Sequence, residues 1–102
     1  MRLPHAVSAL VLAGLAGAAQ AATHVVTIEG MAMQPATLTV KAGDTITWEN
    51  KDVVPHTVTS PGHFDSKQLH GGKRWTWTAR SKGRFPYICT YHPGMQATVV
   101  VE

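Results

Sequence analysis

Short runs of alternating apolar and polar residues make up most of this chain. The alternation is clean in residues 37–40 and 45–48, and in residues 75–78 tryptophan alternates with threonine. A period of two sends successive side chains to opposite faces of a β-strand, so each run predicts a strand with one buried face. The strands that we expect cover residues 24–28, 37–40, 45–48, 56–59, 75–78, 85–88 and 97–101.

Turn-forming residues separate these runs. Gly30, Gly43 and the Pro61-Gly62 pair each follow a run. Glycine and proline interrupt regular structure and favour tight turns. No segment of useful length repeats its apolar residues with the period of a helix. Short strands at this spacing predict an all-β fold, a β-sandwich of about seven strands, in which residues 60–73 form an irregular crossing between the sheets.

The start of the chain has a different pattern. A positive charge at Arg2 precedes residues 6–19, which are almost wholly apolar, and an Ala-Gln-Ala tripeptide ends the segment at Ala21. These features are typical of a secretory signal peptide with an A-x-A cleavage site. A membrane helix is the alternative, but it needs about 20 apolar residues. We therefore predict a signal peptide over 1–21 and one periplasmic domain over 22–102, with no membrane span after cleavage.

Cysteine usage limits how this small domain can be stabilised. An exported domain of about 80 residues has a small core and often relies on disulfides. Cys89 is the only cysteine of the sequence, so no disulfide can form within the chain. A bound metal ion would supply the missing stabilisation, and it would also explain a free thiol in an oxidising compartment.

The charge is mildly positive, with nine lysines and arginines against six acidic residues. Five of the basic residues gather in one region, at Lys73, Arg74, Arg80, Lys82 and Arg84. Such residues commonly protect an exposed sheet edge from pairing with other strands. They can also steer an acidic partner toward the surface. We favour the sheet edge, and the small positive excess on an exported chain argues against nucleic-acid binding.

A thiol, an imidazole and a thioether lie within seven residues of one another. Cys89, His92 and Met95 are spaced C-x2-H-x2-M, in the tight connection between the last two expected strands. Three donors on one short connection at the end of a strand can face a single ion. A second imidazole, His56, lies 33 residues upstream of Cys89 and must reach the site from a neighbouring loop.

Two imidazoles, one thiolate and one thioether are the ligand set of a blue-copper, or type 1, electron-transfer site. The soft sulfur ligands stabilise Cu(I) and the imidazoles suit Cu(II). Taken singly, each residue would be an ordinary packing or surface residue, and it is the joint spacing that favours a metal site. Zinc also accepts cysteine and histidine, but a thioether is a poor zinc ligand. We therefore expect one copper ion, bound by His56, Cys89, His92 and Met95.

The remaining sulfur and imidazole side chains carry weaker signals. Met31 and Met33 form a Met-x-Met pair that could hold Cu(I) transiently, although filling the end of the core is the commoner role of methionine. His24, His63 and His70 have no partner at metal-site spacing and are expected at the surface. The tryptophans expected in or against the core are Trp48, Trp75 and Trp77.

Further segments extend this pattern over the whole of residues 22–102. They are Met33-Gln34-Pro35, residues 42–48, Asn50-Lys51-Asp52, Pro55-His56-Thr57-Val58, Phe64-Asp65-Ser66 and residues 87–95. Together they resemble the cupredoxins, the type 1 blue copper family, and most closely its small bacterial, amicyanin-like members. The two-residue gap between His92 and Met95 is similar to the short ligand loop of amicyanin.

The resemblance implies a Greek-key β-sandwich with copper at one end. By position, His56, Cys89 and His92 would be the strong equatorial ligands and Met95 the weak axial one. His92 would be partly exposed, so that electrons pass through its edge. Apolar residues would ring this histidine, the candidates being Met31, Met33, Pro93 and Gly94.

The implied function is that of a periplasmic carrier of single electrons, monomeric and not an enzyme. By resemblance, its transient partners would be a periplasmic dehydrogenase as donor and a c-type cytochrome or oxidase as acceptor. The sequence has no Ser-His-Asp constellation, no paired-carboxylate motif, and too few histidines at motif positions for an oxidase with further copper centres. The alternative is a copper carrier or chaperone that delivers copper to a cuproenzyme, with the Met31-Met33 pair as its distinctive support.

Two positions depart from the amicyanin pattern. Thr57 follows the first histidine, where amicyanin and plastocyanin commonly have an asparagine that braces the ligand loops. A threonine hydroxyl is expected to replace only one of those hydrogen bonds. Gly94 stands in place of a bulkier residue, which reduces the apolar face around His92.

Overall fold

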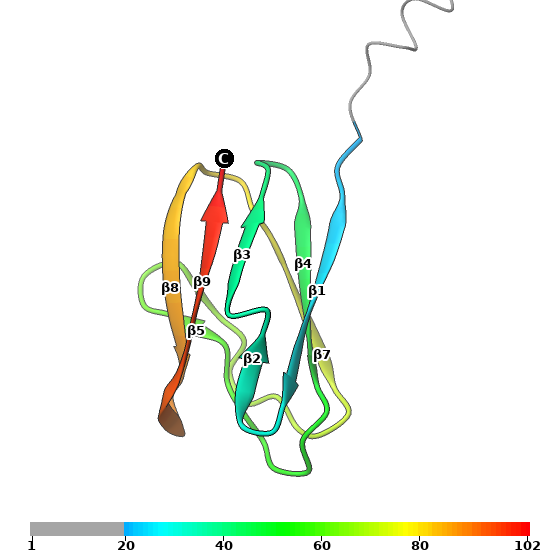
Figure 1. Cartoon of the computed structure of the whole chain (residues 1–102), viewed down its shortest axis with the longest axis vertical. Helices are drawn as coiled ribbons and strands as arrows, with labels where there is room; N and C mark the ends of the chain where they lie inside the picture. Colours follow the sequence, from blue (N-terminus) through cyan, green and yellow to red (C-terminus); the bar gives the residue numbers. More distant parts are fainter. Residues whose placement is uncertain (1–19) are drawn as a thin grey trace, which may run out of the picture.

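The computed structural model describes residues 20–102, so the predicted signal peptide lies almost entirely outside the described residues. Within this range the backbone forms nine strands and no helix, arranged as two packed sheets (Figure 1). The strands are β1 (Thr23–Glu29), β2 (Ala32–Gln34), β3 (Thr37–Val40), β4 (Thr45–Asn50), β5 (Thr59–Ser60), β6 (Phe64–Asp65), β7 (Arg74–Thr78), β8 (Gly83–Cys89) and β9 (His92–Val101). The predicted all-β sandwich is confirmed. The described part of the chain holds no helix with the length and apolarity to cross a membrane.

Both sheets mix parallel and antiparallel pairs. One sheet has the order β2-β1-β4-β7, and the other has the order β3-β9-β8-β5-β6. β1 runs parallel to β4, from Thr23 opposite Thr45 to Ile28 opposite Asn50, and β3 runs parallel to β9. Parallel neighbours need crossover connections, so the chain passes repeatedly from one sheet to the other. The passage from β6 to β7 falls within residues 60–73, where a crossing was expected.

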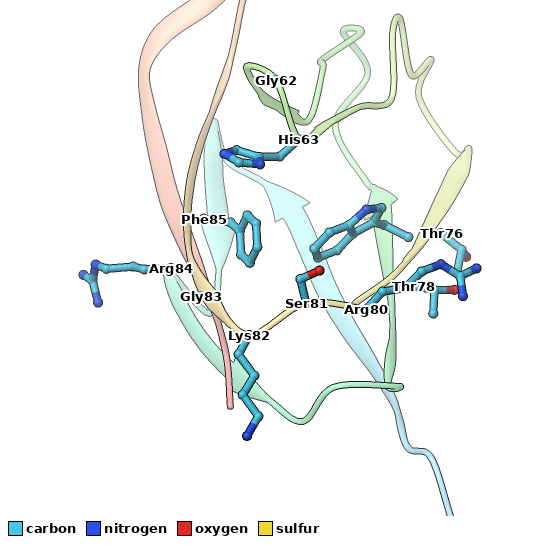
Figure 2. A pocket seen from close by; sticks show the side chains of 11 residues that line it. Gly62, His63, Thr76, Thr78, Arg80, Ser81, Lys82, Gly83, Arg84 and Phe85 are labelled. Carbon is cyan, nitrogen blue, oxygen red and sulfur yellow. The ribbon is translucent and has the colours of Figure 1, made fainter.

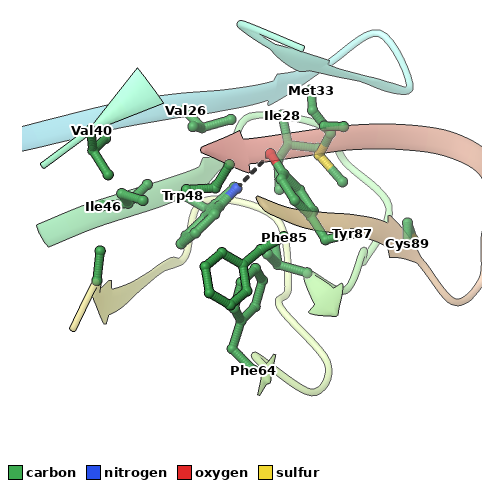
Figure 3. Close-up of a cluster of buried hydrophobic side chains, with 14 of the residues drawn as sticks. Val26, Ile28, Met33, Val40, Ile46, Trp48, Phe64, Phe85, Tyr87 and Cys89 are labelled. Carbon is green, nitrogen blue, oxygen red and sulfur yellow. Dashed lines mark hydrogen bonds between the residues drawn. The ribbon is translucent and has the colours of Figure 1, made fainter. Parts of the chain in front are cut away.

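Aromatic side chains fill much of the space between the sheets (Figure 3). Trp48 is fully buried, and its indole N–H donates a hydrogen bond to the Tyr87 hydroxyl at 3.0 Å, drawn as the dashed line in Figure 3. Burial raises the pKa of Tyr87 to about 12, so the phenol stays neutral. Trp75 and Trp77 are half-buried against this cluster, and the expected placement of the tryptophans is confirmed. The core thus anchors β8, the strand that ends at Cys89.

Short strands account for the main differences from the expected elements. The strand expected over 56–59 is displaced, because His56 forms an isolated bridge with Leu69 and β5 begins only at Thr59. β2 and β6 contain three and two residues. Runs of that length are too short for alternation to be recognised in a sequence.

Candidate metal centre

Cys89 and His92 lie on either side of a tight reversal between β8 and β9. β9 begins at His92 and not at residue 97 as expected, so the connection has only two residues. Cys89 pairs with His92 in the ladder, after a register shift that follows Ile88. Residues opposite each other in an antiparallel pair have neighbouring side chains. The ladder therefore sets the separation of the thiol and the second imidazole.

His56 reaches the same end of the sandwich from the connection between β4 and β5. Its backbone N–H donates to the Leu69 carbonyl at 3.0 Å, and its carbonyl accepts from the Leu69 N–H at 2.8 Å. The side-chain amide of Asn50 donates to the carbonyls of Val54 at 2.9 Å and Leu69 at 3.0 Å. Asn50 and His56 are fully buried. The segment that carries the first histidine is therefore held from both sides by hydrogen bonds.

The donor atoms of three predicted ligands converge. One donor atom each from His56, Cys89 and His92 lies within 4.8 Å of the other two. The Cys89 Sγ lies 3.6 Å from Nδ1 of His56 and 3.6 Å from Nδ1 of His92. Cys89 and His56 are fully buried, whereas His92 is half-buried. Met95, the fourth predicted ligand, is a buried residue of β9 three positions after His92.

Asp52 contacts the ring of the first histidine, a role that its place in the segment Asn50-Lys51-Asp52 did not reveal. Its Oδ2 lies 2.8 Å from Nε2 of His56. Burial raises the pKa of Asp52, but hydrogen bonds from His56, Met31 and Gly30 outweigh burial and hold the pKa below its usual value. An ionised carboxylate only accepts hydrogen bonds, so Nε2 of His56 carries the proton and Nδ1 presents a lone pair toward Cys89. Carboxylates commonly fix metal-binding imidazoles in this way.

The same carboxylate holds the turn between β1 and β2. It accepts the backbone N–H of Gly30 at 2.8 Å and of Met31 at 3.1 Å. Both residues have positive φ, 65° at Gly30 and 61° at Met31. A non-glycine residue adopts that conformation uncommonly, and turns of this handedness suit a two-residue hairpin. Asp52 therefore ties the first hairpin of the domain to the buried histidine.

Thr57 braces the ligand loops more fully than expected. Its Oγ1 accepts the backbone N–H of Thr90 at 2.8 Å and lies 3.1 Å from the Thr90 hydroxyl. The Thr59 hydroxyl donates to the same oxygen at 3.0 Å. The backbone N–H of Thr57 also donates to the Cys89 Sγ at 3.3 Å. The single hydroxyl bond expected at this position is replaced by three contacts, so the loops are joined despite the missing asparagine.

The cluster fits copper better than it fits zinc. It combines two imidazoles with one thiolate, and a thioether lies buried on the same strand as the second imidazole. Type 1 copper takes two histidines and one cysteine in a trigonal arrangement with a weak methionine, whereas structural zinc sites are tetrahedral and use more thiolates. One copper ion is the cofactor that these residues fit.

The apolar ring expected around His92 is only partly correct. Met31 is 43% exposed, and Pro93 and Gly94 are exposed. Met33, in contrast, is 4% exposed and lies among the core residues of Figure 3. A Cβ added at Gly94 would meet no atom within 4 Å, so the backbone there leaves open space beside the second histidine.

Three further apolar residues are exposed on the connections that carry the ligands. Tyr91, next to His92, is 48% exposed, and Val53 and Val54 are 97% and 45% exposed. Both valines belong to the short segment that precedes His56. Apolar side chains that gather into one exposed patch mark a contact surface for another molecule, whereas single ones are ordinary. Nothing in the sequence pattern separated them from ordinary strand valines.

A cleft of about 650 Å³ lies away from the metal cluster, along β7 and β8 (Figure 2). Trp77, Phe85 and His63 form its walls, and the ring of His63 meets that of Phe85 edge-on at 4.9 Å. Lys82 and Arg84 also line the cleft and are exposed. β7 is an edge strand of its sheet. Arg74 lies on this edge strand, as the interpretation of the basic residues expects, whereas Arg84 lies on the inner strand β8.

Comparison with known proteins identifies the family. Residues 4–101 match the family described as the cupredoxin-like domain. Amicyanin-alpha of Methylorubrum extorquens is 33% identical over 90 residues, which cover 82% of this chain and 76% of that protein. Amicyanin of Paracoccus denitrificans is 37% identical over 84 residues, and the match covers 76% of this chain and 64% of that protein.

Solved structures agree with the sequence matches. An oxidised proline-to-alanine variant of amicyanin gives a TM-score of 0.75 at 33% identity, with 85% of this chain and 88% of that chain covered. A purple cupredoxin from Nitrosopumilus maritimus gives 0.73 at 26% identity, with 78% and 99% covered. The fold, the donor cluster and the relatives agree with one another. The chain belongs to the cupredoxin-like family, as an amicyanin-like member.

Proposed function

We propose that this protein carries single electrons between periplasmic proteins through a type 1 copper ion bound by His56, Cys89, His92 and Met95. The observation that carries the proposal is the contrast in exposure within one cluster. Cys89 and His56 are fully buried, and His92 is half-buried at the end of the sandwich. A metal held there is shielded from solvent chemistry, yet it has one imidazole edge through which an electron can pass.

Bound copper supplies the one-electron couple between Cu(II) and Cu(I), and the chain supplies a fixed geometry for both states. Asp52 holds the ring of His56, and Thr57 holds the loop of Cys89 through Thr90. Fixed ligands rearrange little when the charge on the metal changes. Little rearrangement lowers the barrier to electron transfer, so these hydrogen bonds support the role of a carrier.

Partners would dock on the apolar end of the domain. Val53, Val54 and Tyr91 are exposed on the connections that carry the ligands, and Met31 is exposed on the turn between β1 and β2. Exposed apolar side chains suit brief contacts of small area, as electron-transfer encounters require. We propose a periplasmic dehydrogenase as donor and a c-type cytochrome or oxidase as acceptor, with the carrier itself monomeric and not catalytic.

The first test is a visible spectrum of the exported protein after addition of one equivalent of Cu(II). An intense blue band that bleaches with reductant is expected, because a short thiolate–copper bond produces it. Mixing the reduced protein with an oxidised c-type cytochrome should then restore the band and reduce one haem for each copper. A pale solution would contradict the assignment of Cys89. A blue protein that exchanges no electron with the cytochrome would contradict the carrier function.

The copper-carrier alternative loses its distinctive support. Met31 is 43% exposed on the turn, while Met33 is 4% exposed and packs in the core. One thioether is therefore at the surface and the other in the core, which does not support a shared surface site for Cu(I). Electron transfer is the function that the observed geometry favours.

A further inference from the structure

A second group of nitrogen donors lies at the opposite end of the sandwich from the copper cluster. β1 begins there, beside the turn between β3 and β4 (Figure 1). The carboxylate of Asp44 accepts the backbone N–H of Ala22 at 2.9 Å and contacts Nε2 of His24 at 2.9 Å. A cleft of about 300 Å³ opens beside these residues and is also lined by Lys41 and Glu102. His24 is therefore half-buried against a carboxylate and is not the plain surface residue that was expected.

The charge on Asp44 decides which nitrogen of His24 is free. Hydrogen bonds from the backbone N–H of Ala22, from His24 and from the backbone N–H of Lys41 lower the pKa of Asp44 to about 2. The carboxylate is therefore ionised and accepts only, so Nε2 of a neutral His24 carries the proton. Nδ1 keeps its lone pair and has no hydrogen-bond partner within residues 20–102. An imidazole whose other N–H rests on a carboxylate is a common form of metal ligand.

Processing would complete the donor set. Cleavage after Ala21 gives a chain that begins Ala22-Thr23-His24. A free amine, two backbone amides and an imidazole then stand in immediate succession, and together they close fused chelate rings around one ion. Planar nitrogen sets of this kind select Cu(II) and Ni(II). We propose that the processed amino terminus is a second metal site for a divalent, square-planar ion. Its ligands are the Ala22 amine, the amide nitrogens of Thr23 and His24, and Nδ1 of His24.

Binding at this site breaks one backbone hydrogen bond between the start of β1 and β4. The Thr45 N–H donates to the Ala22 carbonyl at 3.0 Å in the extended strand, and a planar chelate turns the first backbone nitrogens to one side. The change stays local, because β2 pairs with β1 only from Thr27 onward and the rest of β1 remains paired with β4. The proton of the amine and the protons of the two amides leave for solvent as the ion takes their place. The bond from Nε2 of His24 to Asp44 can persist.

The test uses the exported, processed protein with its type 1 site already filled with Cu(II). Intact mass first establishes the amino terminus, and a chain that does not begin at Ala22 overturns the site. A second equivalent of Cu(II) should then bind and add an electron paramagnetic resonance signal with the wide copper splitting of a planar nitrogen site. This signal is distinct from the narrow splitting of thiolate-bound copper. A second equivalent that stays free in solution also overturns the site.

The sharpest control inserts one glycine before Ala22, with the glycine shown by intact mass to be the new first residue. Every side chain is kept, including the pair of His24 and Asp44, but the imidazole moves to the fourth position and the second signal should vanish. His24→Ala should also abolish it, whereas His63→Ala, at an exposed histidine elsewhere, should not. A glycine-extended protein that binds the second ion like the parent contradicts the proposal. The blue band is independent of these changes, so their failure leaves the electron-carrier function untouched.

Discussion

The two imidazoles of the copper cluster are held in contrasting ways. His56 is fully buried, its backbone is bonded to Leu69 in both directions, and its Nε2 lies 2.8 Å from Asp52. His92 is half-buried beside a two-residue reversal. Within residues 20–102 the ring of His92 makes one hydrogen-bond contact with a side chain, at 3.6 Å to the Cys89 Sγ, and meets the ring of His56 edge-on at 5.2 Å between centroids. One ligand is fixed by the scaffold, and the other is open to whatever docks there.

This difference separates two requirements of a carrier. The ligands must keep their positions when the charge on the metal changes. On the buried side, hydrogen bonds of Asp52 and Asn50 fix the position of His56. Electrons must also reach the metal, and in the proposed function the half-buried edge of His92 is their path. Because separate segments meet these needs, substitutions on the two sides should have different consequences.

Removing the sulfur of Cys89, which contacts both imidazoles, should have the largest effect on the copper site. We expect Cys89→Ser to abolish the blue charge-transfer band completely, because a hydroxyl at this position does not replace the thiolate. Absorption and electron paramagnetic resonance after addition of Cu(II) measure the loss. Thr90→Ser, one residue further along the chain, is the matched control and should stay blue. A blue Cys89→Ser protein would refute the ligand assignment for both sides.

Deleting each imidazole in turn compares the two sides directly. His56→Gly and His92→Gly should both lose the blue colour. Added imidazole should restore it at the half-buried position 92, where a small ligand can enter from solvent, and should fail at the fully buried position 56. Titration of each variant with imidazole, followed by absorption, gives the comparison. Equal rescue of both variants would contradict the idea that one side is closed.

Loosening the buried side without removing a ligand should have an intermediate effect. Asp52→Asn keeps the shape of the side chain but weakens the bond that orients His56. Loss of such a partner typically lowers metal affinity by roughly 10–100-fold. Competition with a copper chelator measures the affinity. Glu49→Gln is the control, because Glu49 is an acidic residue of β4 that pairs with exposed Arg74 at 3.5 Å. An affinity equal to that of the parent would show that Asp52 does not hold the ring.

The sequence predicted the open side better than the buried side. Alternation located the main strands, and the spacing of Cys89 and His92 placed both donors at one reversal, because neighbours in sequence must be neighbours in space. Asp52 and Leu69 were missed. Their contacts with His56 depend on how the chain between β4 and β7 folds back on itself, and no periodicity records that path.

The axial position should affect the potential more than the binding. Met95→Gln should keep the copper and the blue colour but lower the reduction potential, because an oxygen donor favours Cu(II) more than a thioether does. Voltammetry on the parent and the variant measures the shift. Met33→Leu, at another buried methionine, should leave the potential nearly unchanged. An unchanged potential in Met95→Gln would argue against Met95 as a ligand.

The smallest effect is expected at Thr57, which joins the segment of His56 to the loop of Cys89 and His92. Thr57 follows His56 in sequence, and its hydroxyl holds Thr90, which follows Cys89. Thr57→Val removes the hydroxyl at nearly constant volume and leaves the Thr90 N–H without its acceptor, which should lower the free energy of unfolding of the copper-free domain by about 1–3 kcal/mol. Urea titration measures this change, and the copper protein should remain blue. Thr57→Ser keeps the hydroxyl and should lose much less. If the valine variant is as stable as the parent, the hydroxyl of Thr57 does not hold the loops together, and the two sides of the cluster are joined only through the metal and the backbone.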